Sequence, residues 1–138
     1  GEAMREQLYY YLQNYAGLTA LIGANLFPQR VPTGKALPTL AYTFSGRNPE
    51  YDQDGLDGEN EVTVEFNCNA STLGGAVAVA DQLYLAMAIQ NDATFGELGN
   101  YVTLYSTTLE TEFDNFDLFD GSEDGTRIVT QTYTLRYK

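Results

Sequence analysis

The stretch from Pro38 to Met87 decides the fold, and it reads PTLAYTFSGRNPEYDQDGLDGENEVTVEFNCNASTLGGAVAVADQLYLAM. Apolar and polar residues alternate over 40–45 and again over 62–69. Such alternation predicts strands with one buried face and one polar face. A polyanionic segment separates the two runs. The pattern therefore predicts a strand pair joined by a long acidic loop.

The end of the same stretch predicts an amphipathic helix. Apolar residues recur at helical spacing between Leu73 and Met87, and Ser71 or Thr72 can cap the first turn. Glycine and alanine keep this helix slim, so it can lie close to a sheet.

The chain before Pro38 predicts one helix and one short strand. Residues 5–16 carry an apolar helical stripe, and Gly17 can end that helix. Residues 18–23 form one short apolar turn closed by a second glycine, Gly23. Residues 25–32 form an edge-like strand, because their prolines cannot donate to a central ladder. The stripe consists of Leu8, Tyr11, Leu12 and Tyr15.

The chain after Met87 predicts two long strands, roughly 101–113 and 126–137. Strands of this length can carry a bulge or project beyond the sheet. The whole order is α-β-β-β-α-β-β. It predicts an α+β fold in which two main helices pack on one face of an antiparallel sheet.

The 138 residues fit one domain. We take Gly1 to Ala3, ahead of Met4, as a cloning remnant and expect residues 4–138 to form a single domain. The one cysteine, Cys68, excludes an intrachain disulfide and fits a reducing compartment. No apolar run is long enough to cross a membrane as a helix.

Charge is the strongest compositional feature: 19 acidic residues against seven basic ones give a net charge of −12. Such a surface repels the phosphate backbone, so tight nucleic-acid binding is not expected. It either keeps the protein soluble or forms a surface to which passing DNA must not stick. The acids cluster as Asp52, Asp54, Asp57, Glu59 and Glu61, and as Asp114, Asp117, Asp120, Glu123 and Asp124.

The sequence gives no support for catalysis. It contains no histidine, which removes Ser-His-Asp and Cys-His nucleophiles and histidine metal sites. It has neither a phosphate-binding glycine loop nor a dinucleotide fingerprint. Cys68 lies on the apolar face of its strand, where a buried, inert thiol is expected. We therefore expect no enzymatic activity and no cofactor.

Calcium is the main chemical alternative, because both acidic segments space oxygen ligands closely. Read as an EF-hand from Asp52, the first segment has Leu56 and Thr63 where ligands belong. The second, from Asp120, has Gln131 at the position of the bidentate glutamate. Weak screening by divalent cations fits both segments better than a specific metal site.

Three consecutive tyrosines on the first helix cannot all face one core. Tyrosine is favoured in interfaces because it buries area at low entropic cost and keeps a polar tip. Tyr9 and Tyr10 are therefore candidate subunit contacts, and partial exposure on a monomer is the alternative.

These elements together resemble the tail completion, or tail terminator, proteins of long-tailed bacteriophages and prophages. The resemblance lies in the first helix followed by LTALIG at 18–23, the short strand at 26–28 and the strand opened by PTLAY at 38–42. It continues through the strand at 62–69 into the helix at 71–87 and closes with Gly125-Thr126 leading into the last strand. It covers nearly the whole chain.

The resemblance implies a structural subunit of a ring, typically hexameric, at the head-proximal end of the tail tube. Such a ring ends polymerisation of the tail tube protein and offers a docking surface to the head connector or stopper protein. DNA would pass through the hole without tight binding, and no membrane is involved. The protein would be assembled in the bacterial cytoplasm and belong to the virion. The two acidic clusters are then candidate lumen or partner-contact loops.

Two other functions stay open at this stage. One is a head-side connector or stopper subunit, which would differ in its partner. The other is an acidic module that binds calcium or a basic protein, which would behave as a monomer.

Overall fold

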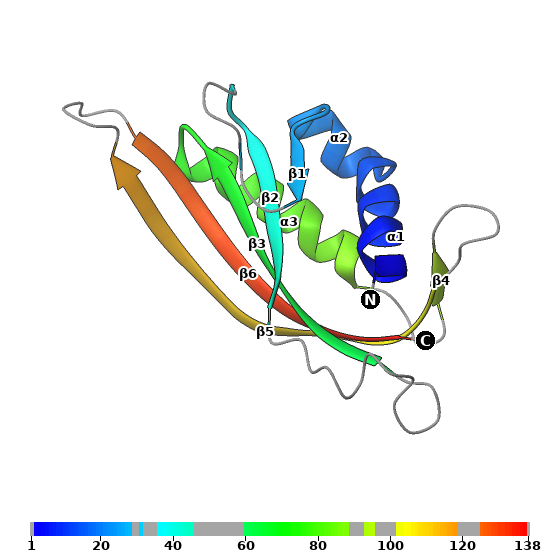
Figure 1. Ribbon diagram of the computed structural model, residues 1–138. Coiled ribbons are helices and arrows are strands. Elements are labelled where there is room, and N and C mark those ends of the chain that lie inside the picture. Colours follow the sequence, from blue (N-terminus) through cyan, green and yellow to red (C-terminus); the bar gives the residue numbers. More distant parts are fainter. Residues whose placement is uncertain are drawn as a thin grey trace.

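The computed structural model describes residues 2–28, 31, 36–45, 60–88, 93–95, 102–118 and 125–137. They form three helices and one six-stranded sheet of order β1-β2-β3-β6-β5-β4 (Figure 1). The helices are α1 (Glu2–Gln13), α2 (Ala16–Ile22) and α3 (Leu73–Met87). The strands are β1 (Leu26–Pro28), β2 (Thr39–Ser45), β3 (Asn60–Ala70), β4 (Ala93–Phe95), β5 (Val102–Leu118) and β6 (Gly125–Tyr137).

β3 forms the centre of the core, as the alternation predicts. Val62, Val64, Phe66 and Cys68 are buried on one face, and the three helices lie on that side of the sheet (Figure 1). We call this face the helix side and the opposite face the open side. The Phe66 ring contacts Tyr133 of β6 edge-on, with centroids 5.7 Å apart, and Tyr42 of β2 at 5.5 Å. These rings join three strands into one aromatic core.

α3 covers the middle of the sheet and contacts both β3 and β6. The Thr72 side chain caps it by accepting a hydrogen bond from the Gly75 N–H at 3.0 Å. α2 packs beside α3 at Gly17, where a Cβ atom would overlap the amide of Gln82. A side chain at position 17 would therefore require the flexible end of Gln82 to move.

The N-terminal prediction needs three corrections. α1 ends at Gln13, and Gly17 lies inside α2 instead of ending the first helix. Residues 16–22 form a helix of their own, longer than one turn, because Leu18 and Ile22 are buried four positions apart. The glycine with positive φ is Gly23, at 60°. As predicted, Gly23 closes this segment, and it does so in a backbone conformation that other residues adopt rarely.

The sheet is mixed, whereas the sequence predicted an antiparallel one. β1 pairs with β2 in parallel, with Leu26 opposite Leu40, while every other pair is antiparallel. β1 is the edge strand of the sheet and stops at Pro28. A proline has no N–H with which to extend the ladder.

β5 is the longest strand and exceeds its predicted end at Phe113. It runs to Leu118 because Asp114 to Leu118 stay in register with Val129 to Gly125 of β6. The predicted irregularity is confirmed, since the register shifts between Leu104 and Ser106 and between Leu109 and Thr111. β5 ends and β6 begins at the far left of Figure 1, away from α1 and α2.

Candidate assembly surfaces

Three of the ten predicted acidic residues lie in the described part of the chain: Glu61, Asp114 and Asp117. Glu61 is the second residue of β3, and its carboxylate accepts a hydrogen bond from Arg136 Nε at 3.0 Å. This exposed pair contributes little to stability. Asp114 and Asp117 lie in strand β5, where the sequence predicted a connecting loop, and Asp114 is exposed. The other predicted acids lie outside the described residues: Asp52, Asp54, Asp57, Glu59, Asp120, Glu123 and Asp124.

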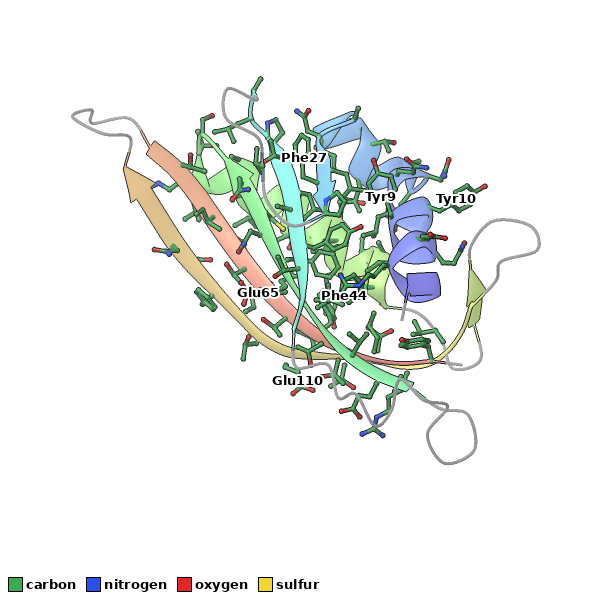
Figure 2. All side chains as sticks on the ribbon, in the orientation of Figure 1. Tyr9, Tyr10, Phe27, Phe44, Glu65 and Glu110 are labelled. Carbon is green, nitrogen blue, oxygen red and sulfur yellow. The ribbon has the colours of Figure 1, made fainter. Side chains whose placement is uncertain are left out.

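The predicted tyrosines lie on two faces of α1. Tyr9 is half-buried and faces a groove between α1 and the β1–β2 edge of the sheet. Tyr10 is 37% exposed and projects away from the sheet (Figure 2). The consecutive tyrosines therefore divide between core and surface, as helical geometry requires.

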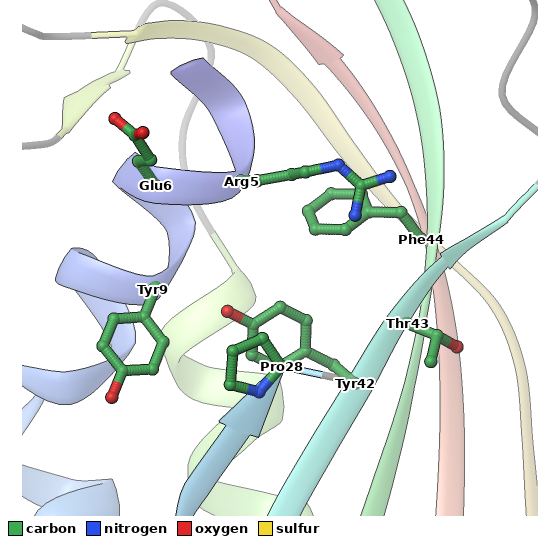
Figure 3. Close-up of a pocket in the computed structure, with 7 residues that line it drawn as sticks. All are labelled: Arg5, Glu6, Tyr9, Pro28, Tyr42, Thr43 and Phe44. Atoms are coloured by element: carbon green, nitrogen blue, oxygen red, sulfur yellow. The ribbon is translucent and has the colours of Figure 1, made fainter. Parts of the chain in front are cut away.

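The groove has a volume of about 790 Å³, and we call it the α1 groove. Arg5 crosses it to lie over the Phe44 ring, with the guanidinium carbon 4.5 Å from the ring centroid (Figure 3). Burial raises the pKa of Tyr42 in its floor; Tyr9 adds to the rise, and Arg5 opposes it. The groove is thus an aromatic surface with a guanidinium at its rim. Its lining residues are Arg5, Glu6, Tyr9, Pro28, Tyr42, Thr43 and Phe44.

A second surface combines an exposed flank of α3 with the exposed part of β5. Leu73, Val77 and Tyr84 are 45%, 38% and 50% exposed. At about 100° per residue they fall on one flank of α3, opposite the Gln82 that packs against α2. On β5, residues 111–115 are all exposed. We call Leu73, Val77, Tyr84, Glu112 and Asp114 the α3–β5 strip.

Gln131 of β6 ties the two parts of this strip together. Its Nε2 donates to the carbonyl of Ala80 on α3 at 3.1 Å and to Glu112 Oε2 at 2.6 Å. Its Oε1 accepts from the Tyr133 hydroxyl at 2.5 Å. Gln131 is only 1% exposed, so these partners satisfy a buried amide that would otherwise be destabilising. The network holds Glu112 beside α3.

The open side of the sheet carries hydroxyl rows that sequence reasoning missed. Strand register places threonines of β3, β6 and β5 in one row and a glutamate with two threonines in the next. The rows are Thr63–Thr134–Thr108 and Glu65–Thr132–Thr111. Cross-strand hydrogen bonds join Asn69 to Thr39 at 3.0 Å and Thr130 to Asn67 at 2.7 Å. The strand alternation predicted this polar side, but the register that forms the rows could not be predicted.

The described residues contain no group of three or more acidic, cysteine or histidine side chains able to hold a metal ion. The first calcium-like segment lies outside those residues, as does the second up to Gly125. Within the described chain, no helix is long and apolar enough to cross a membrane.

The comparisons with known proteins identify the family. The chain matches the family of tail completion protein gp17 over residues 6–137. Because the match spans nearly the whole chain, the protein belongs to this bacteriophage tail completion family, whose members are structural virion proteins.

A solved structure shares the fold. A chain from the virion of a native gene transfer agent particle superposes with a TM-score of 0.61 at 16% identity, covering 99% of this chain and 95% of that one. No match was found among curated proteins. The protein is a virion component with a structural role in tail completion.

Proposed function

We propose that this protein is a tail terminator: a ring, most simply a hexamer, that caps the head-proximal end of the tail tube. The observation that carries the proposal is the family match over residues 6–137. The ring would end polymerisation of the tail tube protein and present its other side to the head connector or stopper protein. Residues 4–138 are its single working domain, and the ring would be assembled in the bacterial cytoplasm.

The distribution of surfaces supports a ring. A closed ring needs two different patches that bind each other head to tail. The α1 groove lies on one side of the molecule, and the free end of β5 lies on the other (Figure 1). Unlike patches on opposite sides favour a ring over a two-fold dimer, in which one patch would meet its own copy.

Charge supports passage of DNA through the ring without tight binding. A net charge of −12 repels phosphates, and hydroxyl groups displace no counterions. We propose two groups of acids as lumen or partner-contact residues. The first is Asp52, Asp54, Asp57, Glu59 and Glu61, and the second is Asp114, Asp117, Asp120, Glu123 and Asp124. The hydroxyl rows of the open side are a third polar surface that we expect not to bind DNA tightly.

The test is to add the purified protein to polymerising tail tube protein and measure tube lengths by electron microscopy. A terminator shortens the tubes and decorates one end of each. Tubes of unchanged length with bare ends would reject the proposal, and binding to a head connector instead would assign the protein to the head side.

A deletion variant tests the first acidic segment. Removing residues 52–59 should leave capping of tubes intact and abolish joining of capped tails to filled heads, because the segment is assigned to partner contact. Infectious particles formed in an in vitro joining assay are the readout. Joining at the normal level would show that the segment makes no essential contact.

A further inference from the structure

The helix layer is incomplete over β5. α3 contacts β3 and β6, and α1 contacts β5, but residues 111–115 of β5 are all exposed. Glu112 and Asp114 share the helix side, because they pair with Gln131 and Val129, yet both are exposed. An apolar helix flank lies beside them. The α3–β5 strip is therefore a site with one apolar wall and one acidic wall.

The α1 groove has the complementary chemistry. Arg5 is the one basic residue in the three helices, and it lies at the rim of an aromatic surface. β5 carries Glu110, Glu112, Asp114 and Asp117 and no basic residue. A guanidinium with aromatic neighbours matches a surface of carboxylates and aliphatic side chains.

A second copy that binds the α3–β5 strip must overcome the repulsion between two negatively charged chains. Each copy carries −12, so two copies approach favourably only where a base of one meets acids of the other. α1, which lines the groove, and the end of β5 beyond Asp114 lie on opposite sides of the molecule, which favours contact of Asp114 with a second copy (Figure 1).

We propose that the α3–β5 strip of one copy binds the α1 face of the next, with Arg5 facing Glu112 and Asp114. The neighbour's α1 then covers the exposed stretch 111–115 of β5. Tyr9, which lines the groove together with Arg5, packs toward Leu73, Val77 and Tyr84. This inference names the subunit contact of the ring and so rests on the proposed function.

Photo-crosslinking tests the contact directly. Tyr84 is replaced by p-benzoylphenylalanine, and equal amounts of isotope-labelled and unlabelled protein are irradiated with and without tail tubes. Mass spectrometry should find mixed-isotope adducts to residues 2–13 or 39–45. The same replacement at Phe113, which is 52% exposed on the open side of β5, is the matched control and should give none there. Adducts from Tyr84 only within one copy, only to tube protein, or not at all would overturn the proposal.

A charge-swap cycle tests the ion pair. Arg5→Glu and Asp114→Arg should each weaken self-association by about tenfold, and the double variant should restore most of it. Asp114 is preferred to Glu112 because Glu112 also accepts from Gln131. A double variant as weak as the sum of the singles would contradict a direct Arg5–Asp114 contact.

The two hypotheses fail in different ways. Tubes capped normally while the crosslinks map elsewhere would reject this contact and leave the terminator function standing. Crosslinks at this contact with uncapped tubes would do the opposite.

Discussion

β3 and β5 are long strands of one sheet that differ in what covers them. β3 lies between β2 and β6 and beneath α3, and its helix-side residues Val62 to Cys68 are at most 5% exposed. β5 pairs with β6 along its length, but β4 lies on its other edge only opposite 102–104. Its residues 111–115 are all exposed. β3 builds the folded core, and β5 presents side chains that the described elements leave uncovered.

This difference separates stability from assembly. An exposed strand edge normally risks uncontrolled association, and charged residues or bulges reduce that risk. β5 has both, with two register shifts and four acids. Changes on β3 should therefore alter the free energy of unfolding, whereas changes on β5 should mainly alter binding.

The largest effect on stability is expected at Phe66. Phe66→Ala should lower the free energy of unfolding by about 3–5 kcal/mol, because it removes a fully buried ring that contacts Tyr42 and Tyr133. Urea unfolding followed by circular dichroism gives the value. A loss below about 1 kcal/mol would show that β3 is not the centre of the core.

Cys68 lies on the same helix side of β3 as Phe66, so the reactivity of its thiol measures how well that side is shielded from solvent. Burial of the thiol, together with the negative charge of Glu112, raises the pKa of Cys68 from the usual 9.0 to about 12. Because the thiolate is the reactive form, Cys68 should react with disulfide reagents about a thousandfold more slowly than in the urea-unfolded chain at the same pH. The raised pKa stabilises the fold below about pH 9, and this contribution is lost as the pH rises toward 12. Equal labelling rates in folded and unfolded protein would contradict the burial.

The smallest effect is expected at Phe113, which makes the same substitution on β5 a control for Phe66. Phe113→Ala should change the free energy of unfolding by less than about 0.5 kcal/mol, since the side chain is 52% exposed. The same urea titration measures it. A loss as large as that at Phe66 would mean that the rest of the chain covers the open side of β5.

The sequence predicts the parts of the fold that depend on local pattern. The alternation of β3 and the apolar stripe of α3 lie within single elements, so their spacing shows which face is buried. Both were predicted, as were the α+β class and the Thr72 cap, and Cys68 is buried as expected. The family resemblance, now confirmed over residues 6–137, rested on the order of these elements.

The parts that were missed depend on contacts between distant segments. Asp114 and Asp117 look like loop residues in the sequence, but pairing with β6 keeps them in a strand. The parallel pairing of β1 with β2 is a contact between two separate segments, with Leu26 opposite Leu40. The α1 groove joins Arg5 to Phe44 from two separate elements. Tyr9 and Tyr10 were predicted as contacts from helical geometry alone, and that assignment stays a prediction.

The central claim is that this protein completes tails as a ring, and it is tested most directly by measuring the molecular mass of the assembled protein. Light scattering coupled to size exclusion should be run on the protein alone and on the complex released from tube ends after mild cross-linking. The account predicts a discrete species of about six chains of 15.3 kDa at tube ends, whether or not the ring persists without tubes. A strict monomer under both conditions, with no protein retained at tube ends, would contradict it.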